Sequence, residues 1–272
     1  MMIHKHYSNS TLLTGASGKL GSFIQNSKLF GELLCPELEV FDITKPQTVE
    51  TFFENNSFDT IIHCAAQARV SLAEKDPVTT FQANIIGTAN LVSAVLKKEK
   101  RLKENIRFIH ISTDAVYACD VGGYSEESPT IPYNTYGWAK LGAECAVNVL
   151  SDFCIVRTSF FDSRNIPFPD AAIDQFSSKL ELEEFIKALK VVVEDDFVGT
   201  LNIGSKAMSD YERYKIHKPN LKPTMYEDIQ KELSFKMYKN ASMNITKWKK
   251  LKESNEKAKF KSTKVINSSS SI

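Results

Sequence analysis

Short apolar runs alternate along the chain with longer segments of helical period. Two of the runs, at residues 60–64 and 107–111, lack a polar residue at every second position, which is typical of parallel strands covered on both faces. The candidate strands are residues 10–14, 33–35, 60–64, 107–111, 153–157 and 200–203. Because strands and helices alternate, the pattern predicts a doubly wound parallel α/β sheet.

The helical segments carry apolar stripes that would pack on this sheet. In residues 180–193 the stripe consists of Leu182, Phe185, Ile186 and Leu189. In the helix after the third strand it consists of Phe81, Ile85, Thr88, Ala89, Val92, Val95 and Leu96. From residue 205 onward, loops rich in proline, lysine and asparagine replace the regular pattern, which indicates a smaller lobe.

Three glycines follow the first predicted strand and open a helix. Gly15 permits a tight turn, Gly18 lets backbone amides approach a pyrophosphate, and Gly21 lets helix and strand pack closely. Three glycines can also simply form a turn, but this setting favours a dinucleotide site. Dinucleotide-binding folds usually carry an aspartate or glutamate at the end of the second strand. This chain has none there, because residues 34–36 read Leu-Cys-Pro. Asp42 comes later and fits a helix cap or turn equally well.

Tyr136 and Lys140 lie four residues apart on a predicted helix and therefore on one face of it. A cation beside a phenol favours the phenolate and lowers its pKa from about 10 towards the working range. Such a tyrosine can act as a general acid or base on a carbonyl or carbinol oxygen. A tyrosine four residues before a lysine often occurs by chance. The alternative to a catalytic pair is therefore a surface tyrosine beside a solvated lysine.

Together the glycine turn and the Tyr-Lys pair resemble the extended short-chain dehydrogenase/reductase superfamily, and within it the dTDP-4-dehydrorhamnose reductases. The similarity covers residues 10–160, with a weaker likeness at 174–175 and 199–211. The matching segments are residues 42–44, 63–67, 73–77, Asn84, 111–117, 136–140 and 157–159. The resemblance implies a Rossmann-like fold and a bonded position for Asn84 beside the active site.

The resemblance further implies an oxidoreductase that uses NADP or NAD to reduce a 4-keto-6-deoxy sugar on a nucleotide, in dTDP-rhamnose and polysaccharide biosynthesis. Thr113 would hydrogen-bond the substrate oxygen, Tyr136 would donate the proton, and Lys140 would bind the cofactor ribose and tune Tyr136. Asp114 and Phe160 match substrate-contacting positions, although Asp114 could equally be a cap. The cofactor would contact Tyr136, Lys140, the turn residues Gly15, Ser17, Gly18, Lys19 and Leu20, the adenine-side residues Asp42 and Ile43, and the strand-end residues Ala66, Gln67 and Ala68.

The chain departs from this family at several positions. Residues 70–74 read Val-Ser-Leu-Ala-Glu where the family usually has Val-Asp-Lys-Ala-Glu, so an acid and a base near the substrate are lost. Phe160 replaces a tryptophan, residues 161–173 form a shorter stretch, and the family's Arg-Pro-x-Asn-Ser survives only as residues 239–244. These changes leave the predicted class of reaction unaltered. They do not allow the sugar to be identified from the sequence.

Two other functions remain open on the same fold. A nucleotide-sugar C4 epimerase needs only the tyrosine, the lysine and tightly held NAD, and a non-catalytic NADP-binding regulatory subunit needs no reaction at all. Dehydration is disfavoured, because Ala115 stands where the dehydratases carry a glutamate. The intact set of Thr113, Tyr136 and Lys140 argues for catalysis over regulation.

Composition narrows the partners and the compartment. The 34 basic and 33 acidic residues give a net charge of +1, so neither nucleic acid nor a membrane is expected as a partner, and a homodimer is one possible assembly. The five cysteines are scattered without a CxxC pair, and residues 1–10 lack the apolar core of a signal peptide. We therefore expect a cytoplasmic protein with reduced thiols. His63 and His110 lie in apolar strands and are expected to be core histidines, so no metal site is predicted.

These observations predict a division of the chain. Residues 8–160 form the dinucleotide-binding domain, to which residues 180–203 return. Residues 161–179 and 204–250 form a small substrate lobe. Residues 251–272 form a basic, frayed tail.

Overall fold

The structure is a computed structural model that describes residues 10–269, with side chains described for residues 10–258. The segment before residue 10, for which we predicted no signal peptide, lies outside the described residues. The same holds for residues 270–272 of the predicted tail.

The core of the protein is a six-stranded, fully parallel sheet of order β10-β5-β4-β3-β1-β2. The predicted doubly wound fold is therefore confirmed. The strand order reverses between β1 and β3, and sheets of this kind bind ligands at the carboxyl ends of the strands at such a point. The strands are β1 (Thr11–Thr14), β2 (Leu33–Leu34), β3 (Thr60–His63), β4 (Arg107–Thr113), β5 (Phe153–Thr158) and β10 (Gly199–Ile203).

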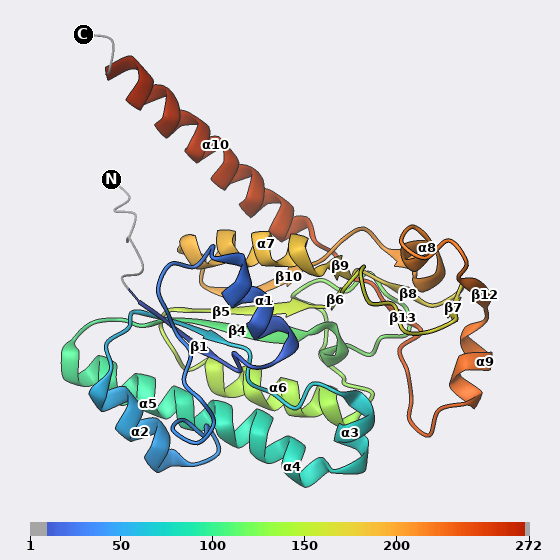
Figure 1. The fold of residues 1–272 in the computed structure, drawn as a ribbon, viewed down its shortest axis with the longest axis horizontal. Coiled ribbons are helices and arrows are strands. Elements are labelled where there is room, and N and C mark those ends of the chain that lie inside the picture. Colours follow the sequence, from blue (N-terminus) through green and yellow to red (C-terminus); the bar gives the residue numbers. More distant parts are fainter. Residues whose placement is uncertain (1–9, 270–272) are drawn as a thin grey trace.

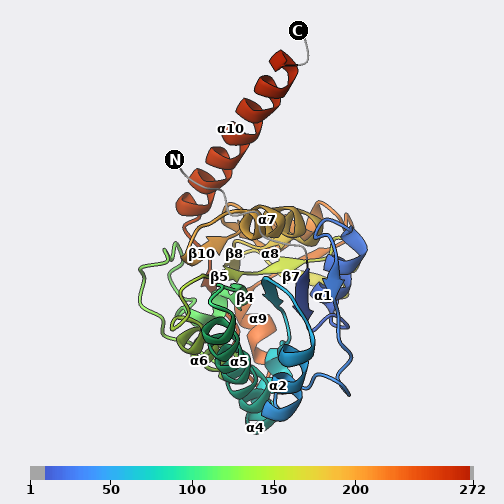
Figure 2. The same ribbon diagram turned by 90° about the vertical axis from the view of Figure 1, so that its left-hand side faces the viewer.

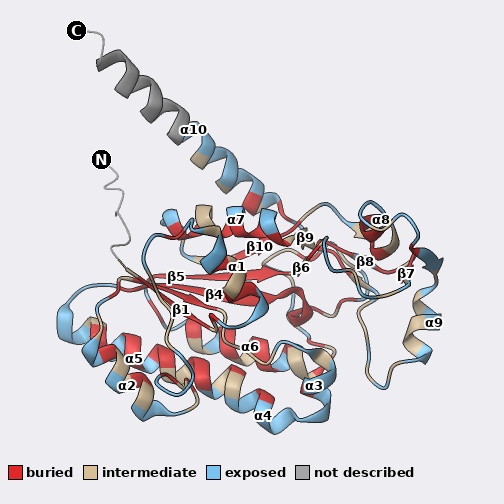
Figure 3. Cartoon of the chain, viewed as in Figure 1, coloured by how far each residue is buried: buried red, intermediate tan, exposed pale blue. Residues whose placement is uncertain are grey.

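Helices cover both faces of this sheet (Figure 1). One apolar cluster joins the sheet to α1 (Lys19–Ser27) and α7 (Leu182–Glu194). A second cluster joins the other face to α2 (Pro46–Asn55), α5 (Gly87–Leu102) and α6 (Thr135–Val147). The strands between the two layers are buried along most of their length (Figure 3).

The helix predicted after the third strand is interrupted by a π-helical turn, η1 (Gln82–Ile86), between α4 (Pro77–Phe81) and α5. Thr88, Val92 and Val95 are buried as predicted, but Phe81 is 41% exposed and Leu96 is 42% exposed, so those two assignments were wrong. The wide turn contains one more residue than an α-helical turn, which changes the face on which the residues around it lie. The buried stripe instead includes Asn84, Gly87, Leu91 and Lys98.

Small sheets and short helices form a lobe at the end of the main sheet where the strands have their carboxyl ends (Figure 1). They come mainly from the segments that we predicted to form a substrate lobe. The strand pairings are β6 with β9, β7 with β12, and β11 and β13 with β8. The elements are β6 (Phe160–Phe161), β7 (Asp170–Ala172), β8 (Phe176–Ser177), β9 (Leu180–Glu181), β11 (Met208–Ser209), α8 (Asp210–Lys215), β12 (Lys222–Thr224), α9 (Tyr226–Lys231) and β13 (Asn240–Ala241).

The last element, α10 (Thr246–Ser269), packs on the domain only near its start. Trp248 and Leu251 join the apolar cluster of α7, and Asn255 Nδ2 donates to Asp195 Oδ2 at 2.6 Å. The helix then extends away from the rest of the molecule (Figures 1 and 2). From the lysine-rich sequence of residues 247–264 we expect a solvated terminal helix and a frayed tail, and α10 runs to Ser269. The division of the chain at residue 251 stays a prediction. Within residues 10–269, α10 included, no helix combines the length and the apolar character needed to cross a membrane.

Candidate active site

The glycine turn after β1 depends on backbone positions that only glycine fits. Gly15 has φ +71°, in the left-handed region, and a Cβ on it would lie 2.6 Å from Ala65 N. A Cβ on Gly21 would lie 2.2 Å from Gly15 O. Both glycines therefore hold the start of α1 against the carboxyl ends of β1 and β3.

The N-terminus of α1 is open to an anion. Gly18 is its N-cap, no side chain caps it, and its first turn contains no acidic residue. Ser17, Gly18 and Lys19 are exposed, so the positive end of the helix dipole faces solvent, while the Gly18 amide donates to Gly15 O at 3.0 Å. A pyrophosphate fits this cradle. Leu20 is buried in the core, so only its backbone is available to a ligand.

Asp42, which we predicted to lie near the adenine of the cofactor, stabilises a local turn with its side chain. Its carboxylate accepts from Thr44 N at 3.0 Å and from Thr44 Oγ1 at 2.7 Å, and it pairs with Lys45 at 3.1 Å. Burial alone would raise the pKa of Asp42, but the hydrogen bonds from Thr44 and the charge of Lys45 lower it. The neighbouring Ile43 is buried. Cofactor contact by either residue stays a prediction.

The segment after β3 is clamped by the π-helical turn. Gln67 N donates to Asn84 Oδ1 at 2.7 Å, and Asn84 Nδ2 donates to Gln67 O at 3.1 Å. Asn84 is 1% exposed, which confirms the expected bonded position. The clamp fixes the backbone of residues 66–68 beside the glycine turn.

His63, at the end of β3, is a bonded core residue, as predicted. Its Nδ1 lies 2.7 Å from Thr14 Oγ1, and its Nε2 lies 2.9 Å from Thr88 Oγ1. Burial lowers the pKa of His63 to about 3, so the ring is neutral. Burial also lowers the pKa of His110, whose Nδ1 is without a hydrogen-bond partner.

A close backbone approach brings Tyr136 next to Thr113. Asn134 caps α6 by accepting from Gly137 N at 2.7 Å. A Cβ on Gly137 would lie 2.3 Å from Ala115 O, so the first turn of α6 packs directly on the backbone that follows β4. As a result, Tyr136 forms a hydrogen bond with Thr113, the last residue of β4.

The electrostatics of Tyr136 differ from the prediction. Burial raises its pKa to about 12, the hydrogen bond with Thr113 opposes this rise, and the charge of Asp114 adds to it. The expected lowering by Lys140 was wrong, because Lys140 Nζ donates instead to His110 Nε2 at 3.1 Å. Tyr136 is therefore a neutral phenol at physiological pH, which is the proton-donating form.

Lys140 is itself buried, and burial lowers its pKa to about 8. Glu144, one helical turn further on, opposes this shift. The Glu144 carboxylate is fixed by Arg157 Nη2 at 2.7 Å and by the hydroxyl of Ser112. Lys140 thus keeps its proton at neutral pH while lying in the interior.

The two predicted substrate residues have different surroundings. Asp114 is 8% exposed, begins the short 3₁₀ helix η2 (Asp114–Val116), and accepts from Thr113 Oγ1 at 3.2 Å. The cap of η2 is Thr113, not Asp114. Phe160 stacks on Phe185 of α7 with ring centroids 5.5 Å apart, so it forms part of the wall between the sheet and the lobe.

The positions that depart from the family lie on α3 (Val70–Lys75). Leu72, where the family carries a base, lines a pocket of about 460 Å³ together with Gln67, Lys75, Asp76 and Thr79. This pocket adjoins the segment after β3, because Gln67 is one of its lining residues.

The lobe contains a charged cluster that was not predicted from the sequence. Lys179 Nζ donates to Asp210 and to the hydroxyl of Tyr214, and it also contacts Tyr238. Asp210 and Tyr214 lie one turn apart on α8, whereas Lys179 and Tyr238 come from two other segments. We name these four residues the Lys179 cluster. Local spacing gives no signal that joins all four.

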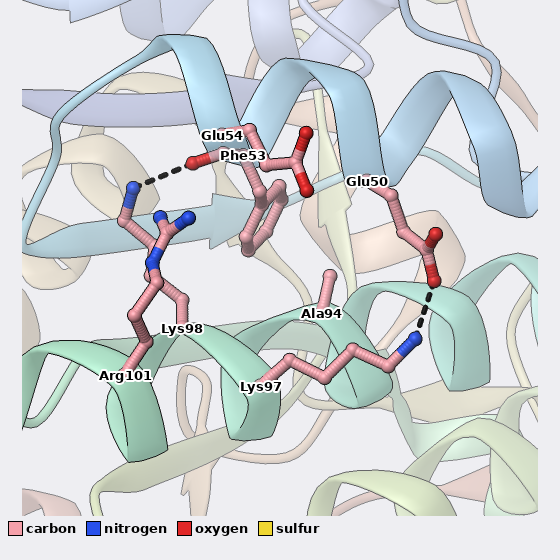
Figure 4. A pocket seen from close by; sticks show the side chains of 7 residues that line it. All are labelled: Glu50, Phe53, Glu54, Ala94, Lys97, Lys98 and Arg101. Atoms are coloured by element: carbon pink, nitrogen blue, oxygen red, sulfur yellow. Dashed lines mark hydrogen bonds and ion pairs between the residues drawn. The ribbon is translucent and has the colours of Figure 1, made fainter.

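A second pocket, between α2 and α5, has a volume of about 250 Å³ and is lined by none of the predicted site residues (Figure 4). Both of its lysines are bonded within the protein. Lys97 forms an ion pair with Glu50, and Lys98 Nζ donates to Phe53 O and Asn56 O, both at 2.7 Å. The pocket therefore belongs to the packing of the two helices.

Comparisons with known proteins show what the chain is similar to. Residues 9–184 match the family model described as RmlD substrate binding domain. The dTDP-4-dehydrorhamnose reductase of Mycobacterium tuberculosis (strain CDC 1551 / Oshkosh) is 31% identical over 161 residues, which are 56% of this chain and 50% of that protein. The UDP-glucose 4-epimerase of Halalkalibacterium halodurans is 36% identical over 104 residues, which are 38% of this chain and 30% of that protein. The chain thus spans half the length or less of these two curated relatives.

A solved structure is similar over most of the chain. The dTDP-4-dehydrorhamnose reductase from Bacillus anthracis str. Ames in complex with NADP superposes with a TM-score of 0.78 at 23% identity and covers 88% of this chain and 92% of that chain. A likeness at this identity shows a shared fold. The family model, which runs from the start of β1 into α7, confirms the resemblance found in the sequence, and the protein belongs to the family of the RmlD substrate binding domain.

Proposed function

We propose that this protein reduces a 4-keto-6-deoxy sugar on a nucleotide with NADPH or NADH, as the name of its reductase relatives suggests. The observation that carries the proposal is the arrangement of Thr113, Tyr136 and Lys140. Thr113 ends β4, Tyr136 lies beside it in the first turn of α6, and Lys140 of the same helix bonds His110 of β4. The open glycine turn follows β1 of the same sheet.

The residues present fit a nicotinamide dinucleotide. The amides of Ser17 and Lys19 would hold the pyrophosphate, because the N-terminus of α1 has no side-chain cap and a Cβ would fill the turn. Asp42 and Ile43 would flank the adenosine, the backbone of residues 66–68 would support the nicotinamide half, and Lys140 would bind a ribose hydroxyl. When bound, the cofactor supplies the hydride.

The chain itself supplies the proton and the positioning. Thr113 donates a hydrogen bond to the keto oxygen, and Tyr136 transfers its phenolic proton to the same oxygen as the carbinol forms. The raised pKa of Tyr136 keeps the phenol protonated until the substrate oxygen becomes basic. When the substrate binds, the Thr113 hydroxyl turns from Asp114 Oδ1 to the keto oxygen, which leaves the Asp114 carboxylate free to accept a hydroxyl of the sugar.

A C4 epimerase is the second candidate, because one curated relative is named as such. An epimerase returns the hydride to the same sugar and consumes no cofactor overall. Ala115 is buried and offers no carboxylate to remove a C5 proton, so dehydration is not expected from this residue.

The test is incubation with NADPH or NADH, labelled with deuterium at the transferred position, and a panel of nucleotide 4-keto-6-deoxy sugars. We expect one cofactor oxidised per sugar reduced and the label at sugar C4. Product without net cofactor oxidation would favour the epimerase. Cofactor binding without turnover across the panel would refute catalysis and favour the regulatory subunit.

A further inference from the structure

The ammonium of Lys140 is buried with one neutral hydrogen-bond acceptor. Lys140 is 3% exposed, and its Nζ donates to His110 Nε2 at 3.1 Å. Glu144, one turn further along α6, is bound by Arg157 Nη2 at 2.7 Å and by the Ser112 hydroxyl. Within the part of the chain whose side chains the structure describes, no carboxylate forms an ion pair with this ammonium and no second acceptor bonds it. An ammonium has three donors and is costly to bury without acceptors, so two N–H groups of Lys140 remain for a ligand.

The bond to Lys140 fixes the position of the hydrogen on the His110 ring. An ammonium can only donate, so His110 Nε2 accepts and the ring hydrogen lies on Nδ1. His110 is fully buried, and its Nδ1 has no hydrogen-bond partner. Because a buried N–H without a partner is costly, nothing at Nδ1 favours this orientation of the ring. The contact that orients the ring is therefore the one from Nε2 to Lys140.

The face of β4 that carries His110 holds α6 at a second point. Successive side chains of a strand alternate between its faces, so His110 and Ser112 point to the same side. Ser112 Oγ donates to Glu144 Oε1, and Glu144 lies one helical turn after Lys140. Two side-chain bonds thus tie one face of β4 to one face of α6. The bond at His110 holds the Lys140 ammonium three residues before Thr113, where β4 ends.

The neighbouring histidine of the sheet makes different contacts. His63 of β3 is the register partner of His110, and the ring centroids lie 5.2 Å apart. Both ring nitrogens of His63 lie within hydrogen-bond distance of threonine hydroxyls, at 2.7 Å from Thr14 and 2.9 Å from Thr88. Of the two buried rings, the one that binds the lysine is therefore His110.

We propose that His110 is a positioning residue of the active site, whose Nε2 holds the Lys140 ammonium at β4 so that its two remaining N–H groups meet hydroxyls of the cofactor ribose next to the nicotinamide. The proposal rests on the proposed function and deepens it, because it adds a residue from outside the glycine turn and the Tyr-Lys pair. The strand then determines where the ammonium lies, and the spacing on α6 alone does not.

Two substitutions separate the position of the acceptor from the loss of the ring. His110→Gln places an amide oxygen near the position of Nε2, whereas the shorter side chain of His110→Asn ends near the position of Nδ1 and does not reach Lys140. In calorimetric titration with NADPH or NADH, whichever the wild type binds, we expect about tenfold weaker affinity in His110→Asn and nearly wild-type affinity in His110→Gln. The adenosine half alone, 2′-phospho-ADP or ADP, lacks this ribose and should bind all three proteins equally. In turnover, the KM for the cofactor should rise in His110→Asn more than kcat falls.

Ser112→Ala is the matched control, because it removes the second bond between β4 and α6 and leaves His110 and Lys140 in place. We expect it to lower the free energy of unfolding without weakening cofactor binding. If Ser112→Ala weakened cofactor binding as much as His110→Asn does, the docking of α6 alone would explain the loss and the proposal would be overturned. The same conclusion would follow if His110→Gln bound the cofactor as weakly as His110→Asn.

Nuclear magnetic resonance of ¹⁵N-labelled histidine tests the bond without cofactor or turnover. We expect His110 to carry its hydrogen on Nδ1 and its Nε2 signal to shift in Lys140→Met, and the other tautomer or an unshifted signal would overturn the proposal. A wild type that binds the cofactor but reduces no sugar would refute the proposed function instead, and the calorimetric comparison would still decide the role of His110. A wild type that binds neither cofactor would overturn the ribose contact together with the proposed function.

Discussion

The glycine turn allows a sharp test, because the structure gives the distance by which a methyl group fails to fit. In Gly21→Ala the new Cβ would lie 2.2 Å from Gly15 O and 2.6 Å from Ala16 Cα, whereas an ordinary contact begins at 3.4 Å. Both atoms belong to the backbone, so no side chain can rotate away. The start of α1 must therefore move by about 1 Å from β1.

Two effects of opposite sign determine the change in stability. Overpacking of this kind costs about 3 kcal/mol at the upper end of its usual range, and replacing glycine by alanine inside a helix recovers about 1 kcal/mol. The net loss in the free energy of unfolding is about 2 kcal/mol, which for a chain of this size lowers the melting temperature by about 4 to 8 °C. NADPH affinity should fall as well, because the displaced amides are those proposed to hold the pyrophosphate.

The assay is thermal and urea unfolding, together with calorimetric titration of NADPH. Gly18→Ala is the comparison, since its Cβ would lie 3.2 Å from the same Gly15 O and needs a shift of only a few tenths of an ångström. We expect Gly18→Ala to unfold close to the wild type. A Gly21→Ala variant with wild-type stability and wild-type NADPH affinity would refute the packing argument.

Two further predictions concern protons. Tyr136→Phe removes one oxygen and keeps the ring, so turnover should fall by about 10² to 10⁴-fold while calorimetric NADPH affinity stays near wild type, and near-normal turnover would remove Tyr136 from the mechanism. The pKa of His63 is about 3 in the folded protein against 6.5 as its ordinary value, so the unfolded state binds more protons between these pH values. His63 should thus contribute stability that is complete above about pH 6.5 and is lost as pH falls towards 3. Urea unfolding across this range should show a weaker acid dependence in His63→Asn, and equal dependence in both proteins would contradict the assignment.

The sequence predicted the features that repeat at fixed spacing. Apolar runs located the strands, and the glycine spacing located the turn at which Gly15 and Gly21 approach neighbouring backbone. The spacing of Tyr136 and Lys140 placed them on one helix face, but it could not show that the lysine would bond His110 and leave the phenol with a raised pKa.

Other features depend on three-dimensional contacts that no local pattern contains. The π-helical turn moved Phe81 out of its predicted stripe, because a single wider turn leaves no sign in hydrophobic spacing. The Lys179 cluster was missed for a similar reason, since its members meet only when the segments before β9 and β13 fold against α8.

The hydrogen bonds around His63 have a fixed direction. The Thr88 hydroxyl donates to Asn84 O at 2.7 Å, so Thr88 Oγ1 accepts from His63 Nε2, and His63 Nδ1 accepts from the hydroxyl of Thr14. Thr14 Oγ1 accepts in turn from Ala65 N at 3.3 Å. The hydrogens of these four bonds therefore all point the same way, from the segment after β3 towards the π-helical turn. Reversing one of the bonds would require the hydroxyls of Thr14 and Thr88 to rotate together. Beneath the proposed dinucleotide site, both ring nitrogens of this imidazole are therefore occupied, so His63 is not free to act as an acid or base in the proposed reaction.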